Sequence, residues 1–246
     1  MTQIIVTMAG AGSRFRRAGF DCPKYEIKAH GRTLIEWSLL SLRNFTEQGA
    51  HVLFVSRRED QAGDFIGEKC SVLGIRTHDL LEIDGTTDGQ ATTAMLVEER
   101  IADPSDAMLI YNIDTFVHPR SLNPQSVRGD GWIPCFPGLG EGWSFAKTDA
   151  DGRVLDLKEK VRISDHATVG LYWFSSFNLF ATTYRAFYAC SENLEKGERY
   201  IAPMYRRLIE SGKEVYIESI PASDVIPIGT PAELEMFLKL VPPNGN

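Results

Sequence analysis

The feature that most constrains the fold is an alternation of short apolar runs and helix-like patterns through the first half of the chain. Residues 4–8 form a continuous apolar run that ends in a glycine-rich loop, as expected for a strand buried on both faces of a sheet. The pattern then predicts helices at 33–45, 59–70 and 89–101, and strands at 51–55 and 108–111. Such alternation favours a mostly parallel sheet with helices on both faces, a three-layer α/β/α fold.

The second half has a different pattern. Residues 143–148 and 154–158 flank Asp149-Ala150-Asp151-Gly152, which predicts a β-hairpin. Further elements are predicted as strands at 169–174 and 214–220 and helices at 177–190 and 201–211. Thr230, Pro231 and Glu233 predict a helix start with a capping box. With no repeat or long linker in the sequence, we expect a single domain over residues 1–246.

Composition excludes several classes of protein. A net charge of -7 gives no basic footprint for nucleic acid or for an anionic membrane surface. The most apolar stretch, residues 168–190, is too polar to span a bilayer. The opening residues resemble a strand rather than a signal peptide. Four scattered cysteines without a CxxC pair indicate a reducing compartment, so we expect a cytoplasmic protein.

The loop after the first strand is a candidate phosphate site. It reads Ala9-Gly10-Ala11-Gly12-Ser13-Arg14, and Pro23-Lys24 follow it. Small residues let the backbone approach a ligand, and successive amide N–H groups can hold phosphate oxygens. Arg14 and Lys24 would neutralise a polyphosphate. The alternative is a tight strand-to-helix turn, and the loop matches neither the Rossmann fingerprint nor the Walker A loop.

Asp114 is a candidate metal ligand. It follows an apolar strand, so it should lie at the carboxyl edge of the sheet, where α/β proteins bind ligands. Magnesium prefers one or two carboxylates together with substrate phosphates. The alternative is that Asp114 only caps a loop before Pro119.

The segment from Met8 to Lys24 resembles the signature of the sugar-phosphate nucleotidylyltransferases, also called sugar-nucleotide pyrophosphorylases. Ala9 stands for the first glycine of that signature and Ser13 for its threonine. Other segments that resemble the family follow in order: Asp88-Gly89-Gln90-Ala91, Tyr111-Asn112-Ile113-Asp114, Trp143-Ser144-Phe145-Ala146-Lys147, Glu159-Lys160, Thr168-Val169-Gly170-Leu171-Tyr172 and Ile228-Gly229-Thr230-Pro231.

The resemblance implies a Rossmann-like, glycosyltransferase-A-like fold, with a nucleotide-binding half at 1–130 and an acceptor-binding half at 131–246. It implies catalytic roles for Arg14 and Lys24 and binding of Mg²⁺ by Asp114. The implied nucleotide-binding residues are Ala9, Gly10, Ala11, Gly12, Ser13, Gly89 and Gln90. The implied substrate-binding residues are Lys147, Glu159, Lys160 and Gly170, with Glu159 on acceptor hydroxyls and Lys160 on the acceptor phosphate. The alternative for Glu159 and Lys160 is a solvated charge run.

One position departs from the family pattern. Many members carry a second metal-binding aspartate three residues before the threonine of the closing Gly-Thr, and that position here is Pro227. Asp224 lies three residues further upstream. The sequence leaves open whether its side chain turns back to the site.

The implied reaction transfers a nucleoside monophosphate from an NTP to a sugar 1-phosphate, releases pyrophosphate and serves polysaccharide biosynthesis. One alternative is a cytidylyltransferase that acts on a non-sugar phosphomonoester. Another is a glycosyltransferase of the same fold, although such enzymes carry Asp-x-Asp where this chain has Asn112-Ile113-Asp114. A third is a catalytically silent nucleotide-binding regulator. The base, the acceptor and the oligomeric state stay open, and a homo-oligomer is compatible with the sequence.

Overall fold

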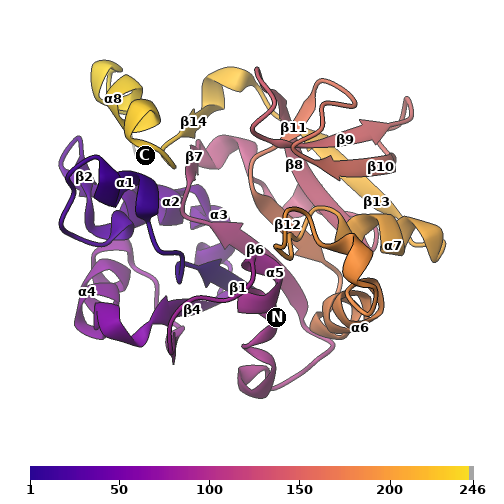
Figure 1. Cartoon of the computed structure of the whole chain (residues 1–246), viewed down its shortest axis with the longest axis horizontal. Coiled ribbons are helices and arrows are strands. Elements are labelled where there is room, and N and C mark those ends of the chain that lie inside the picture. Colours follow the sequence, from indigo (N-terminus) through magenta and orange to yellow (C-terminus); the bar gives the residue numbers. More distant parts are fainter. Residues whose placement is uncertain (244–246) are drawn as a thin grey trace.

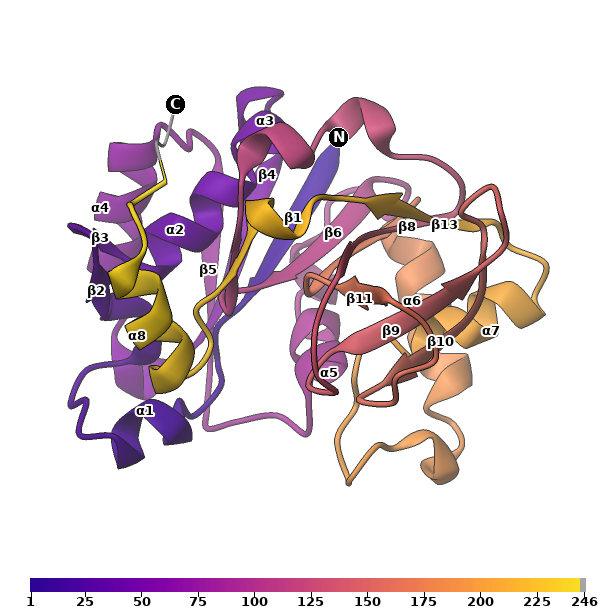
Figure 2. The same ribbon diagram turned by 90° about the horizontal axis from the view of Figure 1, so that it is seen from above.

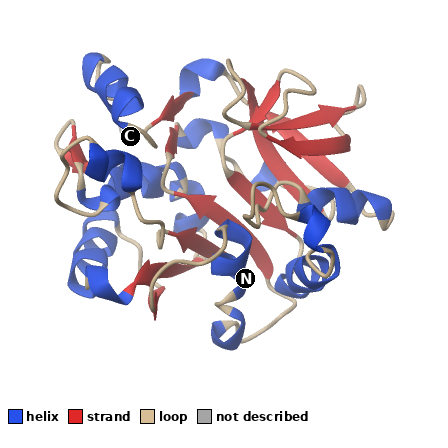
Figure 3. Ribbon diagram, in the orientation of Figure 1, coloured by secondary structure: helices blue, strands red, loops and turns tan. Residues whose placement is uncertain are grey.

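The computed structural model of the chain describes residues 1–243. Its centre is a ten-stranded mixed sheet that runs across the whole molecule (Figures 1 and 3). The strands of this sheet are β1 (Thr2–Thr7), β4 (His51–Arg57), β5 (His78–Ile83), β6 (Ala107–Asn112), β8 (Gly131–Pro137), β9 (Ser144–Thr148), β10 (Val154–Glu159), β11 (His166–Thr168), β12 (Leu171–Phe174) and β13 (Val215–Ser219).

The strand order is β10-β9-β11-β8-β12-β6-β1-β4-β5, with β13 paired to β8. Neighbouring strands from the first half, β5, β4, β1 and β6, are all parallel. Strand β12 joins β6 antiparallel, and the path from there to β10 is antiparallel throughout. The predicted α/β fold with a mixed sheet is confirmed, and the parallel neighbours along this path are gathered in the first half.

Helices cover both faces of the sheet (Figure 2). They are α1 (Ser13–Arg17), α2 (Leu34–Ser41), α3 (Arg43–Glu47), α4 (Gly63–Leu73), α5 (Gln90–Met95), α6 (Phe177–Phe187), α7 (Met204–Glu210) and α8 (Pro231–Lys239). Because side chains alternate along a strand, Ile4 and Val6 of β1 join one core with α2 and α4, whereas Ile5 joins a second core with α5, α6 and α7. Both faces are therefore buried, as the apolar run of β1 predicts.

The last helix, α8, packs beside α1 (Figure 1). Leu234 and Phe237 of α8 share a third core with Phe15 of α1 and with Trp37 of α2. Four short strands accompany this region: β2 (Lys28–Ala29), β3 (Arg32–Thr33), β7 (Thr115–Val117) and β14 (Val225–Pro227). Strand β14 pairs antiparallel with β7, which brings the closing segment to the residues that follow Asp114.

The predicted elements are present, with shifted ends. The hairpin of β9 and β10 is confirmed, whereas the helix expected at 89–101 ends at Met95 and the one expected at 33–45 divides at Leu42. All four cysteines are free thiols. Within residues 1–243, no helix is both long enough and apolar enough to cross a membrane.

Candidate active site

Two segments named from the sequence meet at one edge of the sheet. Strands β1 and β6 are parallel neighbours with Thr7 opposite Asn112, so the loop after Thr7 and Asp114 both lie at the carboxyl ends of their strands. This edge is where open α/β sheets bind ligands. A cavity of about 780 Å³ opens there. The expected site residues that line it are Ala9, Gly10, Ala11, Arg14, Gly89, Gln90, Asp114, Glu159 and Gly170.

A smaller cavity of about 250 Å³ lies against the same loop. Gly12, Ser13 and Lys24 line this smaller cavity, and Arg14 and Asp114 line both. Gly12 has φ 60, in the left-handed region that favours glycine, and it begins helix α1. The loop thus lies between the two cavities, and a ligand can reach it from either of them. We call residues 9–14, Lys24 and Asp114 the loop wall.

Arg14 is an exposed cation at the cavity. Its guanidinium makes no hydrogen bond or ion pair with any residue of the described part of the chain. In contrast, Arg17 of the same helix bonds the carbonyl oxygen of Ser13 at 3.2 Å. Arg14 is therefore available to an anion in the cavity, since a guanidinium binds phosphate oxygens as a fork.

Lys24 and Asp114 form an ion pair at the floor of the site. The Lys24 ammonium donates to Oδ1 of Asp114. The other oxygen, Oδ2, faces Gly229, where an added Cβ would lie only 2.9 Å away, so a glycine there keeps the space around Oδ2 open. One accessible carboxylate beside a phosphate loop suits Mg²⁺, which takes its other ligands from phosphate oxygens and water.

The structure shows where the side chain of Asp224, the nearest upstream carboxylate to Pro227, lies. Its carboxylate accepts hydrogen bonds from Arg120 Nε at 2.8 Å and from Ser121 Oγ at 2.6 Å, and its side chain is only 2% exposed. The hydrogen bonds from Arg120 lower the pKa of Asp224 to about 2. Pro227, three residues later, lines the large cavity but offers no side-chain ligand. Asp224 is thus engaged away from the loop wall.

Glu233 lies at the cavity instead of closing a capping box. Thr230 caps helix α8 by accepting a hydrogen bond from the Glu233 amide at 3.2 Å, as predicted. The reciprocal bond from the Glu233 carboxylate is absent, and that carboxylate has no hydrogen-bond or ion-pair partner among residues 1–243. It lines the large cavity, which the sequence pattern did not indicate.

The opposite side of the cavity is a chain of buried hydrogen bonds. Thr168 and Tyr172 hydroxyls are 2.9 Å apart, Tyr172 donates to Ser144 at 3.3 Å, and Ser144 donates to Glu159 Oε2. Burial raises the pKa of Tyr172, so its hydroxyl stays a donor. All four residues are buried and line the cavity. We call Thr168, Tyr172, Ser144 and Glu159 the network wall.

Lys160 lies at the rim of this wall. Its ammonium donates to the Tyr200 hydroxyl at 2.8 Å and is 3.3 Å from Glu159 Oε1. Burial alone would lower the pKa of Lys160, but the Tyr200 hydrogen bond and the Glu159 charge outweigh it and raise the pKa. Lys160 is therefore a cation at neutral pH.

Two glycines of the site are required by close approaches. An added Cβ at Gly89, which has φ +142, would lie 2.4 Å from the carbonyl oxygen of Arg199. At Gly170, with φ +80, it would lie 2.4 Å from the side-chain nitrogen of Asn112. Gln90, which follows Gly89, donates to the Thr7 hydroxyl at 3.2 Å and so ties helix α5 to the end of β1.

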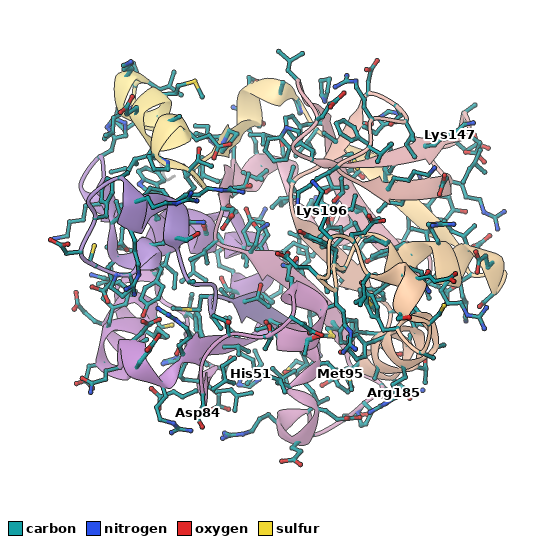
Figure 4. All side chains as sticks on the ribbon, viewed as in Figure 1. His51, Asp84, Met95, Lys147, Arg185 and Lys196 are labelled. Carbon is teal, nitrogen blue, oxygen red and sulfur yellow. The ribbon has the colours of Figure 1, made fainter. Side chains whose placement is uncertain are left out.

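Of the expected site residues, Lys160 and Lys147 line neither cavity. Lys160 still contacts Glu159 and Tyr200, which line the large cavity, whereas among residues 1–243 no hydrogen bond or ion pair joins Lys147 to a cavity residue. This difference sets Lys147 apart. It is exposed at the outer margin of the molecule (Figure 4). Ser144 and Lys147 differ by three positions along β9, so their side chains point to opposite faces of the strand. Lys147 lies on the predicted strand, but the alternation of side chains directs it away from the face of Ser144.

Tyr200, Glu198 and Glu233 all line the large cavity, although none of them is a site residue predicted from the sequence. Tyr200 and Glu198 lie in an irregular segment between α6 and α7, where no periodic pattern marks them. Tyr172 and Ser144 lay inside segments that resembled the family, and that resemblance was the only signal for them.

Comparison with known proteins gives a close match over nearly the whole chain. A nucleoside-diphosphate-sugar pyrophosphorylase from Vibrio cholerae RC9 is 35% identical, covers 96% of this chain and 100% of its own, and superposes with a TM-score of 0.90. Neither a protein-family model nor a curated protein sequence matches the chain.

Two more distant structures share the fold. The inositol-1-phosphate CTP transferase from T. maritima is 16% identical over 97% of this chain and 96% of its own, with a TM-score of 0.73. A Bacillus anthracis protein described as a glucose-1-phosphate thymidylyltransferase, in complex with a sucrose, is 15% identical over 100% of this chain and 98% of its own, with the same TM-score.

The sheet, the cavity at its carboxyl edge and these matches define an enzyme of the nucleotidyltransferase class. Within that class, the chain belongs to the nucleoside-diphosphate-sugar pyrophosphorylase family, the sugar-phosphate nucleotidylyltransferases that its sequence resembles.

Proposed function

We propose that this enzyme transfers a nucleoside monophosphate from an NTP to a sugar 1-phosphate and releases pyrophosphate, in the cytoplasm and for polysaccharide biosynthesis. The observation that carries the proposal is that one cavity of about 780 Å³ is lined by both the loop wall and the network wall. Residues 1–130 would bind the nucleotide and residues 131–246 the acceptor. The Vibrio cholerae relative, named for nucleoside-diphosphate sugars, supports this substrate class.

The chemistry needs positioning and charge neutralisation rather than a covalent intermediate. A phosphate oxygen of the acceptor attacks the α-phosphorus of the NTP and forms the new P–O bond. The bond from the α-phosphorus to the bridging oxygen breaks, and its electron pair leaves with pyrophosphate. No base is needed, since the attacking phosphate is already ionised near neutral pH.

The loop wall would act on the nucleotide. Unpaired Arg14 would hold the β- and γ-phosphates, and Lys24 would neutralise charge at the α-phosphate. Asp114 Oδ2, in the space that Gly229 leaves, would hold Mg²⁺, which supplies further neutralisation of the triphosphate when it is bound.

The network wall would act on the acceptor. Ser144 donates to Oε2 of Glu159 and the Lys160 ammonium lies 3.3 Å from Oε1, so acceptor hydroxyls would use the remaining lone pairs of this carboxylate. Lys160 would offset the charge of the acceptor phosphate, which has to approach a second anion. Gly170 lines the same cavity, and its lack of a side chain would leave room for the Asn112 side chain beside the acceptor.

Pyrophosphate release tests the proposal. The four NTPs are each incubated with Mg²⁺ and a panel of sugar 1-phosphates, inositol phosphate and phosphocholine, with Arg14→Ala as the control. We expect release with one NTP and a sugar 1-phosphate and none without acceptor. Pyrophosphate release only with phosphocholine would show that the acceptor is phosphocholine and not a sugar 1-phosphate. Sugar transfer from a nucleotide sugar to a hydroxyl, without pyrophosphate, would overturn the proposal in favour of a glycosyltransferase.

A further inference from the structure

The segment of residues 195–203, between α6 and α7, lines the large cavity with Glu198, Tyr200, Ile201 and Ala202. Glu195 and Glu198 pair around a tight turn at Lys196 and Gly197, which have φ 54 and 82 as a two-residue hairpin turn requires. Lys196 at its tip is near the centre of the view in Figure 4. We call residues 195–203 the strap.

The strap is fixed to the nucleotide half by its backbone. The Arg199 amide donates to the Asp88 carbonyl at 2.8 Å, and the Arg199 carbonyl accepts from the Ala91 amide at 3.0 Å. The close approach at Gly89 described above makes this contact specific, because any side chain there would push Arg199 away. These hydrogen bonds therefore join the strap to the loop that leads into helix α5.

Tyr200 is where the strap reaches the acceptor half. Its hydroxyl accepts the hydrogen bond from Lys160, and the Lys160 ammonium lies 4.3 Å from the centroid of its ring. The Tyr200 carbonyl in turn accepts a hydrogen bond from the Tyr188 hydroxyl at 2.6 Å. Tyr188 thus holds the backbone of Tyr200, while the Tyr200 hydroxyl holds the lysine.

Lys160 itself adopts an uncommon backbone conformation. Its φ is 51, in the left-handed region that side chains other than glycine rarely enter, and its amide donates to the Trp143 carbonyl at 3.0 Å. Such a conformation directs the side chain back along the end of β10, toward Glu159 and Tyr200. Several independent contacts therefore agree on one position for this ammonium.

We propose that Tyr200 is a positioning residue for Lys160, so that recognition of the acceptor phosphate depends on a strap anchored to the nucleotide half. This inference rests on the proposed function. Tyr200, which lines the large cavity, holds Lys160 beside it by two contacts, a hydrogen bond and a cation–π contact. Through Arg199 and Gly89, the strap couples the acceptor site to the loop that leads into helix α5.

Kinetics with matched variants tests the role. Tyr200→Phe keeps the ring but loses the hydroxyl, and it should raise the acceptor KM about 10-fold, as for a lost hydrogen bond to a charged group. Its kcat and its KM for the NTP should stay within about twofold. Tyr200→Leu, which also loses the cation–π contact, should raise the acceptor KM further, by about another three- to tenfold. Tyr184→Phe is the control, because the Tyr184 hydroxyl bonds Arg199 of the same strap but not Lys160.

A double-variant cycle separates positioning from a general structural effect. In a Lys160→Met background, Tyr200→Phe should change the acceptor kcat/KM by less than about twofold, because the group on which Tyr200 acts is gone. The same loss in both backgrounds, or a loss confined to the NTP, would overturn the proposal.

A measurement without turnover keeps this inference distinct from the proposed function. Lys160 has a 37% exposed side chain, so an amine-acylating reagent reaches it, and its labelling can be followed by peptide mass spectrometry near pH 9. Tyr200→Phe removes a hydrogen bond that raises the pKa of Lys160, so labelling should accelerate at least about threefold, whereas Tyr184→Phe should not change it. Equal labelling rates in wild type and Tyr200→Phe would overturn the positioning role even if turnover is found, and faster labelling would support it even if no substrate pair reacts.

Discussion

The loop wall and the network wall of the cavity differ in the chemical groups that they present to a ligand. The loop wall is backbone, glycine and cations: within residues 1–243, Arg14 is unpaired and Lys24 is bound to a single carboxylate. The network wall is a closed series of side-chain hydrogen bonds from Thr168 to Glu159. Neither wall uses a group from the other.

This difference suits two kinds of recognition, of a triphosphate by the loop wall and of an acceptor by the network wall. A triphosphate is the same in every NTP, so it can be bound by charge and amide groups that fit any polyphosphate. Sugar acceptors differ in the placement of hydroxyls, and a buried network that fixes one carboxylate oxygen can distinguish them. We therefore expect substitutions in the loop wall to reduce the rate and substitutions in the network wall to reduce acceptor affinity.

The largest effect should come from Asp114→Asn. This change removes the charge that would hold Mg²⁺ and also the partner of Lys24, so kcat/KM should fall about 1,000-fold or more at any practical Mg²⁺ concentration. Steady-state assays over a Mg²⁺ titration measure it. Recovery of full activity at high Mg²⁺ would mean that Asp114 is not the principal ligand.

Arg14→Ala and Lys24→Ala come next. Each should lower kcat/KM at least about 100-fold, which is typical for the loss of one electrostatic stabiliser of a transition state. Arg17→Ala is the matched control from the same short helix, because Arg17 lines neither cavity. Near-normal turnover in folded Arg14 and Lys24 variants would remove the phosphate-binding role of the loop.

Glu159→Gln should give a smaller effect of a different kind. We expect the acceptor KM to rise about 10-fold while the KM for the NTP changes by less than about twofold, since a charged hydrogen-bond acceptor is lost on the network wall alone. Lys147→Ala on the paired strand should change neither constant, because Lys147 lies outside both cavities. A rise in the KM for the NTP would show that the two walls are not independent.

The smallest effect on activity should come from Asp224→Asn, which should retain turnover within about twofold and instead reduce the free energy of unfolding by about 1 kcal/mol, a value discounted because Arg120 is exposed. The folded pKa of Asp224 is about 2, below its usual value of about 3.9. Its carboxylate therefore stabilises the fold above about pH 4, and this contribution is lost as pH falls through about 2. Chemical unfolding at pH 7, 4 and 2 should show the stability gap between wild type and variant closing. An Asp224 variant as inactive as the Asp114 variant would show that Asp224 reaches the metal.

The fold was predictable where periodicity was strong. The run at residues 4–8 and the alternation up to residue 111 predict the central strands β1, β4 and β6. Strand β8 was missed because Pro134 and Pro137 interrupt it, and prolines are uncommon inside sheets. Strand β5 was missed because it is an edge strand with mixed polar residues and no clear period.

The candidate site divides in the same way. Arg14, Lys24 and Asp114 lie next to strand ends or in a glycine-rich loop, where local sequence predicts their position. Tyr200 and Glu233 reach the cavity through contacts between distant segments, which no local pattern records. For Lys147 the predicted strand is correct, but its side chain lies on the other face of that strand.

The packing of α8 has a consequence for the order in which the enzyme becomes active. The residues around Asp114 are completed by Gly229 and by the pairing of β14 with β7, and Phe237 closes a core with Phe15 more than two hundred positions earlier. Contacts of such long sequence separation form late, because a large loop has to close first. During translation, β1, β4, β5 and β6 are all synthesised before the closing segment. We expect the nascent chain to stay unable to consume NTP until the closing segment has left the ribosome.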